Sequence, residues 1–142
     1  MATAYVRLQG YRAAAHVAAV LSIAGAVIAV ACSGGKEATA PYQPPPECST
    51  PGVQAGGTQA VVAIRGFAFI PDTLRIAPGT TVSWVNCEAP NIDPHTSTAS
   101  GAEWDSGYLS PGKKYSHTFA VAGRFGYACL PHPFMRGAVI VQ

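Results

Sequence analysis

The segment Cys129-Leu130-Pro131-His132-Pro133-Phe134-Met135 places three kinds of metal-binding side chain within seven residues. With a second imidazole, the thiolate of Cys129, the imidazole of His132 and the thioether of Met135 form a His₂Cys set with a weak axial Met, which suits copper and one-electron transfer. Met135 stands out because the only other methionine is Met1. Cys and Met also bury well in ordinary cores. Ordinary packing, however, does not call for a histidine between two prolines.

The fourth ligand has to come from elsewhere in the chain, where two histidines are candidates. His95 follows the alternating segment 80–86 and lies in a polar loop. His117 alternates with Tyr115 and Phe119, where packing or solvation on a strand face explains it. The loop between Cys129 and Met135 has no second cysteine, which argues against a dinuclear site. We therefore predict one copper per chain, cycling between Cu(I) and Cu(II), with the ligands His95, Cys129, His132 and Met135.

Short strands have to position these ligands. Apolar runs and alternating segments separated by Gly and Pro predict an all-β fold, a β-sandwich. In this arrangement Cys129 ends a strand, and His132 and Met135 lie on the short loop before the last strand. Pro131 and Pro133 restrict that loop. The expected strands are 61–64, 67–69, 74–76, 80–86, 113–119, 124–129 and 136–142, with Trp104 expected in the core.

Taken together, the motifs resemble the cupredoxins, the type 1 blue copper proteins, and their spacing is most similar to the amicyanin and plastocyanin-like members. The resemblance covers about 61–142 and implies a Greek-key β-sandwich, a type 1 copper and an electron carrier. Many relatives have Asn directly after the upstream histidine, where this chain has Thr96, whose hydroxyl offers a shorter bond between the ligand loops. The motifs are Phe69-x-Pro71, Ile76-x-x-Gly79-x-x-Val82-x-Trp84-x-Asn86, Pro94-His95 and Tyr127-x-Cys129-x-x-His132-Pro133-x-Met135-x-Gly137.

The first 31 residues have the pattern of an export signal. Two arginines precede an uncharged run rich in Ala, Val and Ile. Ala29-Val30-Ala31-Cys32 resembles a bacterial lipoprotein processing site, which predicts a lipid anchor at Cys32. Simple secretion and an uncleaved anchor over 13–31 are the alternatives. All three place the remainder outside the cytoplasm, in the periplasm or at the cell surface, and the first adds a membrane anchor.

The expected organisation has three parts, and the cysteines bear on it. Residues 1–31 form a lipoprotein-type signal peptide, 32–58 a flexible tether rich in Pro and Gly, and 59–142 the cupredoxin domain. Because Cys32 fits a lipid anchor and Cys129 a metal, Cys48 and Cys87 remain for a disulfide, which export permits. Two unpaired thiols are the alternative. Closing that loop of about forty residues would stabilise the domain by roughly 3–4 kcal/mol.

The charge balance limits the choice of partner. The net charge of +2 comes from Arg7 and Arg12, and seven basic against seven acidic residues remain from Cys32 onward. A neutral domain lacks the basic surface that nucleic acid requires. We expect a monomer that docks briefly with a redox donor and a redox acceptor. The expected docking patch surrounds the edge of His132 and consists of Pro131, Pro133 and Phe134.

Three other functions compete with electron transfer. A copper storage or delivery protein usually carries several methionines or exposed cysteines, whereas the mature chain has one methionine. An enzyme would need a further catalytic metal, for which His117 is the only spare histidine after the leader, so we expect a carrier and no enzyme. A metal-free adhesion module would tolerate replacement of Cys129 without any change beyond stability.

Overall fold

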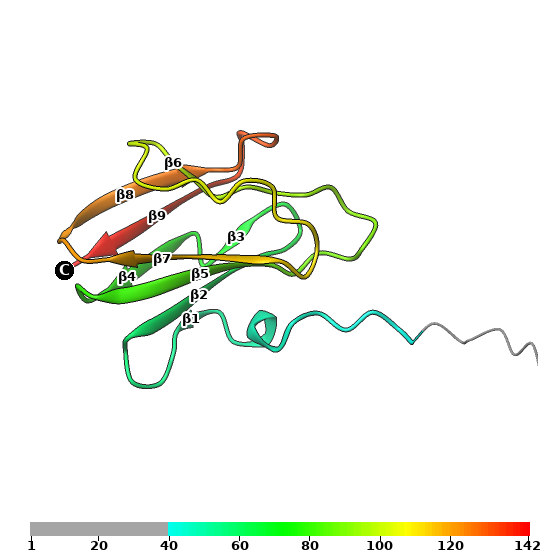
Figure 1. Ribbon diagram of the computed structural model, residues 1–142, viewed down its shortest axis with the longest axis horizontal. Coiled ribbons are helices and arrows are strands. Elements are labelled where there is room, and N and C mark those ends of the chain that lie inside the picture. The colour runs from blue at the N-terminus through cyan, green and yellow to red at the C-terminus, as the bar shows by residue number, and fades with distance from the viewer. Residues whose placement is uncertain (1–39) are drawn as a thin grey trace, which may run out of the picture. The chain divides into compact units, whose positions relative to one another are not determined.

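The structure, a computed structural model, describes residues 40–142, whose regular secondary structure is almost entirely β-strand (Figure 1). Within that range no helix is both long and apolar enough to cross a membrane. The expected signal peptide 1–31 and the expected lipid anchor Cys32 lie outside the described residues. The elements are the 3-10 helix η1 (Pro46–Ser49) and the strands β1 (Gly52–Val53), β2 (Gln59–Ile64), β3 (Phe69–Ile70), β4 (Thr73–Ile76), β5 (Thr80–Asn86), β6 (Thr98–Ala99), β7 (Lys114–Phe119), β8 (Gly123–Ala128) and β9 (Arg136–Val141).

The strands form two sheets. The first has the order β1-β2-β5-β7, with β3 also paired to β2, and the second has the order β4-β9-β8-β6. Pairs β2–β5 and β4–β9 are parallel, whereas hairpin-like pairs such as β8–β9 are antiparallel. Strands that follow one another in sequence therefore often lie in different sheets, as Greek-key connections require. The predicted all-β sandwich is confirmed.

An aromatic core fills the space between the sheets. Trp84 of β5 stacks on Trp104 with ring centroids 5.1 Å apart. Tyr127 of β8 meets Trp84 edge to face at 5.4 Å. Such aromatic pairs add about 0.5–1.5 kcal/mol each to the burial of their surface. Trp104 is buried, as predicted. This core holds β8 in place up to its last residue, directly before Cys129.

Gly137 shows how closely β8 and β9 approach near the ligand loop. It pairs with Tyr127 across the two strands. A Cβ added at Gly137 would overlap the phenol ring of Tyr127. The Tyr127 ring therefore needs a glycine opposite it, which explains why the motif has Gly137 at this position.

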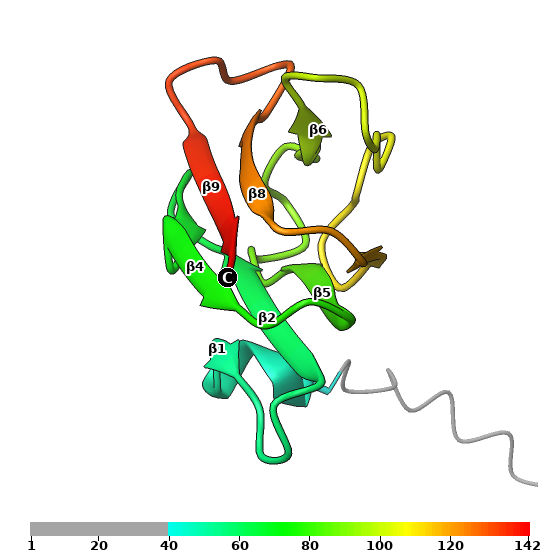
Figure 2. The ribbon, with the colours of Figure 1, turned by 90° about the vertical axis from the view of Figure 1, so that its left-hand side faces the viewer.

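The N-terminal arm, residues 46–58, differs from the flexible tether predicted for 32–58. η1 and β1 lie on the outer side of β2 (Figure 2), and Cys48 forms a disulfide with Cys87. The arm covers an apolar cluster on the outer face of the first sheet, and without this cover the cluster would contact water. The folded body thus begins before Gln59, and the cluster consists of Cys48, Val61, Ala63, Val85 and Cys87.

Phe67 also differs from prediction. The sequence predicts a strand over 67–69, but β3 starts at Phe69. Gly66 and Phe67 both have positive φ, 62° and 55°, which is the left-handed region that side chains rarely adopt. The resulting turn takes the Phe67 ring out of the sheet and against the residues described next.

Candidate metal centre

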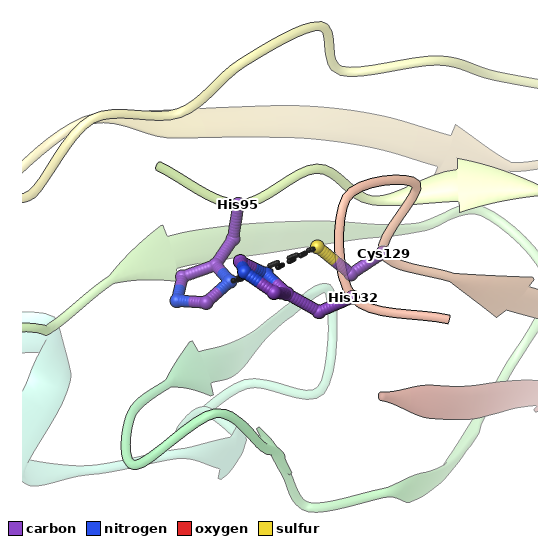
Figure 3. A group of neighbouring side chains, drawn as sticks. All are labelled: His95, Cys129 and His132. Carbon is purple, nitrogen blue, oxygen red and sulfur yellow. Dashed lines mark hydrogen bonds between the residues drawn. The ribbon is translucent and has the colours of Figure 1, made fainter. Parts of the chain in front are cut away.

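Three donor atoms meet at one end of the sandwich. The Nδ1 atoms of His95 and His132 are 3.1 Å apart, and each is 3.6 Å from Sγ of Cys129. Figure 3 shows both imidazoles turned toward this sulfur. A point at the centre of that triangle is about 2 Å from each atom, which is the length of metal–nitrogen and metal–sulfur bonds. The arrangement fits a metal ion that binds a sulfur and two imidazole nitrogens at this distance.

Cys129 is fixed by its position at the end of β8. Cys129 is fully buried, and it is the only free cysteine among residues 40–142. Its backbone N–H donates to the carbonyl of Met135 at 3.1 Å, which closes the ligand loop. The backbone N–H of Thr96 donates to its Sγ at 3.3 Å. These two contacts fix the position of the sulfur atom.

His95 is anchored on the protein side of the site. Its backbone forms a bridge with Leu109, with hydrogen bonds of 3.1 and 2.7 Å. The ring is fully buried. Burial, followed by the nearby His132, lowers the pKa of His95. The neutral imidazole that results is the form that binds a metal ion.

A buried carboxylate stands behind His95. Oε1 of Glu88 lies 3.5 Å from Nε2 of His95, the ring nitrogen that faces away from Cys129. The same oxygen accepts a 3.0 Å hydrogen bond from the backbone N–H of Phe67. His95 Nε2 makes no hydrogen bond in the described part of the chain, so Glu88 acts on the ring through its charge, which raises the pKa of His95 against the larger effect of burial. Glu88 directly follows Cys87, so the disulfide holds the segment that presents it.

The ring of Phe67 packs against both histidines. It meets His95 and His132 edge to face, with centroids 5.2 and 4.9 Å apart. It is partly buried and joins the main core. The Phe67 ring thereby helps to hold both imidazoles in their orientations.

The downstream part of the site is open. His132 is half-buried, and its carbonyl accepts a 2.9 Å hydrogen bond from the backbone N–H of Met135. Met135 itself is buried in the same core cluster as Cys129. Phe134 and Leu130 are 71% and 60% exposed. The predicted docking residues Pro131, Pro133 and Phe134 all lie on the surface.

Thr96 connects the two ligand segments. Its Oγ1 accepts a 2.9 Å hydrogen bond from the backbone N–H of Leu130. This is the short bond that the sequence suggested for Thr96. His117 takes no part in the site: its ring stacks on Trp104 at 5.3 Å, on the sheet face where the sequence placed it.

Residues 57–142 match the family of copper binding proteins described as plastocyanin/azurin. The chain belongs to this family, and copper is its cofactor, in agreement with the donor set above. The resemblance to cupredoxins is thus confirmed.

Several known proteins are similar to the chain. Amicyanin-alpha of Methylorubrum extorquens is 37% identical over 90 residues, 62% of this chain and 74% of that protein. Amicyanin of Paracoccus denitrificans is 37% identical over 86 residues, 58% of this chain and 64% of that protein. Plastocyanin of Scenedesmus fuscus is 37% identical over 87 residues, 52% of this chain and 86% of that protein.

Solved structures of cupredoxins superpose on this chain. A purple cupredoxin from Nitrosopumilus maritimus superposes with a TM-score of 0.53 at 27% identity, over 58% of this chain and 99% of that one. A Cu(I) amicyanin variant superposes with a TM-score of 0.51 at 29% identity, over 58% of this chain and 80% of that one.

Sequence reasoning missed three residues around the site: Glu88, Phe67 and Leu130. Glu88 had one available signal, an acid placed directly after the buried strand that precedes His95. Phe67 gave a misleading signal, because it extends an apolar run and looks like strand. Leu130 lies inside the ligand loop, and its exposure depends on the direction in which the loop turns.

Proposed function

We propose that the protein is a one-electron carrier, in which a single copper ion is held by His95, Cys129, His132 and Met135 in a type 1 site. The observation that carries this proposal is the convergence of one sulfur and two imidazole nitrogens at the buried end of β8. Copper, when bound, supplies the Cu(II)/Cu(I) couple. The protein is a carrier and no enzyme.

The chain's own part in this function is to keep the donor atoms in one geometry. Backbone hydrogen bonds close the loop from Cys129 to Met135, and Pro131 and Pro133 restrict its φ angles. His95 is held by its bridge to Leu109. A site that does not rearrange between oxidation states transfers electrons with a small reorganisation cost, which supports electron transfer over copper delivery.

The exposed side of the ligand loop is proposed as the docking surface. His132 reaches the surface beside Phe134 and Leu130, two large apolar side chains that are mostly exposed. Small apolar contacts of this kind suit brief encounters between redox proteins. We therefore assign His132 as the point of electron exit and entry, with transient partners and a monomeric carrier.

We also propose that the carrier is exported and tethered to a membrane through a lipid on Cys32. The support is the signal-like leader and the small residues before Cys32. Replacing Cys32 by Ala in the full chain should move the protein from the membrane to the soluble fraction of an exporting bacterial host. Ala29→Leu, which creates the residue preferred at such sites, should keep it in the membrane. A Cys32→Ala protein that stays with the membrane would contradict the lipid anchor.

Voltammetry distinguishes an electron carrier from a copper-delivery protein. The measurement uses residues 40–142 loaded with copper, in the presence and absence of a Cu(I) chelator such as bathocuproine. A carrier cycles reversibly and keeps its Cu(I) on exposure to the chelator. A delivery protein surrenders Cu(I) within the same time. His117→Gln is the matched control, because this histidine lies outside the site.

A further inference from the structure

Asn86 is a polar residue in the interior of the molecule, close to the metal centre in the chain but outside its ligand set. It is the last residue of β5 and is fully buried. A buried primary amide costs free energy unless both its oxygen and its nitrogen have hydrogen-bond partners. An asparagine at this position therefore needs one partner that donates and one that accepts.

Both halves of the Asn86 amide have such a partner. Its Oδ1 accepts a 3.0 Å hydrogen bond from the backbone N–H of Glu88, and its Nδ2 donates a 2.7 Å hydrogen bond to the carbonyl of Leu109. Because a backbone N–H only donates and a carbonyl only accepts, the amide has one orientation in which both bonds form. An aspartate would lack the donor, and a leucine would lack both groups.

Each of the two bonds leads to His95. The carbonyl of Leu109 also accepts the 3.1 Å hydrogen bond from the backbone N–H of His95, so the Asn86 amide and the His95 backbone donate to the same oxygen. Glu88 carries the carboxylate whose Oε1 lies 3.5 Å from Nε2 of His95. Asn86 therefore contacts the peptide on which His95 rests and also the residue behind its ring.

The loop that carries His95 has little other regular support. His95 lies between β5 and β6, outside both strands, and its backbone is held by an isolated bridge to Leu109. The main chain of Asn86 adds two bonds there: its N–H donates to the carbonyl of Lys113 at 2.9 Å, and its carbonyl accepts from the N–H of Gly112 at 2.8 Å. Asn86 thus fastens the start of this loop to the segment on which the end of the loop rests.

We infer that Asn86 is a positioning residue for the metal centre and holds the buried ligand His95 in place. It acts through Leu109 and Glu88 and not by binding the metal. Without its side chain, Nδ1 of His95 should no longer keep its place 3.6 Å from Sγ of Cys129. The inference rests on the proposed copper function, but the hydrogen bonds belong to the protein with or without the metal.

The first test follows backbone amide exchange in the metal-free protein. Asn86→Leu keeps the approximate size of the side chain and removes both hydrogen bonds. Exchange at the amides of Glu88 and His95, relative to Val139 in β9, should become roughly fivefold faster, the effect of about one neutral hydrogen bond. If Asn86→Leu does not fold, Asn86→Ser is measured in its place, since its shorter side chain cannot reach both partners, and the same change is expected.

Thr80→Val is the matched control for a general loss of stability. Thr80 is buried at the opposite end of β5, and its hydroxyl donates a 3.1 Å hydrogen bond to the carbonyl of Gly57. This variant should leave the relative exchange at Glu88 and His95 as it is in the wild type. Relative exchange rates that are equal in the Asn86 variant and in Thr80→Val would overturn the positioning role.

The second test uses the copper-loaded protein, where a residue that only stabilises the fold would change nothing. The Asn86 variant should shift the thiolate–copper band and raise the reduction potential, because a less well-placed His95 nitrogen stabilises Cu(II) less. Thr80→Val should leave both unchanged. An equal band and potential in the two variants would overturn the positioning role. A wild-type protein without a thiolate–copper band would instead refute the proposed function, and the exchange result would still decide whether Asn86 holds the His95 loop.

Discussion

The two histidines of the site lie in opposite surroundings. His95 is fully buried, bridged to Leu109 and backed by Glu88, whereas His132 is half-buried on a loop whose tip projects Phe134 into solvent. The first is held by contacts from several distant parts of the chain, and the second by a loop of seven residues and the ring of Phe67. The difference suggests a division of work, in which the buried side fixes the geometry and the open side exchanges electrons.

The largest expected effect breaks this comparison directly. His95→Gly and His132→Gly should each abolish the visible band of the copper-loaded protein, because each removes a ligand. Added imidazole should restore a band only in His132→Gly, since solvent reaches that side and not the other. The spectrum of each variant is measured with and without imidazole. Rescue of both variants to the same extent would show that the two sides are equally open.

The second prediction concerns the disulfide on the buried side. Replacing both Cys48 and Cys87 by Ser should lower the free energy of unfolding of the metal-free protein by about 3–4 kcal/mol, because the unfolded chain loses a cross-link of about forty residues. Denaturant unfolding measures the change. The double variant is compared with Ser49→Ala, an exposed neighbour in η1. A double variant as stable as this control would mean that the arm adds nothing to the buried side.

The third prediction sharpens the role of the open side. Phe134→Ala should slow electron exchange with a redox partner by up to about tenfold, the effect of about 1.4 kcal/mol of lost docking contact. It should leave the reduction potential unchanged, because the side chain is mostly exposed. Val121→Ala serves as control, since Val121 is equally exposed and lies outside the ligand loop. A slower rate accompanied by a changed potential would place Phe134 in the site and not in docking.

The smallest predicted effect is a pH dependence from His95. Its pKa is lowered in the folded protein, chiefly by burial, so the unfolded chain binds the proton more readily. The stability of the metal-free protein should therefore be complete above the ordinary histidine pKa of about 6.5 and fall as pH drops below it. His95→Gln should remove part of this slope, measured by denaturant unfolding between pH 5 and 8. A slope that is unchanged in His95→Gln would assign the effect to another group.

How much of the molecule the sequence predicts depends on whether the signal is local. Alternation in 80–86 and 113–119 predicts β5 and β7, and the types and order of the ligands predict which atoms meet near Cys129. The strand signals lie within a few consecutive residues, and three of the four predicted ligands lie within the seven residues from Cys129 to Met135.

What the sequence did not predict depends on contacts between distant segments. Nothing near Phe67 indicates that a left-handed turn carries its ring against both imidazoles, and the partner of Glu88 is set by how two loops pack. The composition of the arm before Gln59, rich in Gly and Pro, predicts a flexible tether. Its order comes from the apolar outer face that it covers and from Cys87, 39 residues farther along the chain than Cys48.

The central claim is that Cys129 and two histidines bind copper in a type 1 site. The most direct test is the visible spectrum of residues 40–142 after addition of one equivalent of Cu(II), compared with the Cys129→Ser protein. We expect an intense thiolate-to-copper band in the wild type and none in Cys129→Ser. A colourless wild-type protein that binds Cu(II) only weakly, or a band that survives in Cys129→Ser, would contradict the claim.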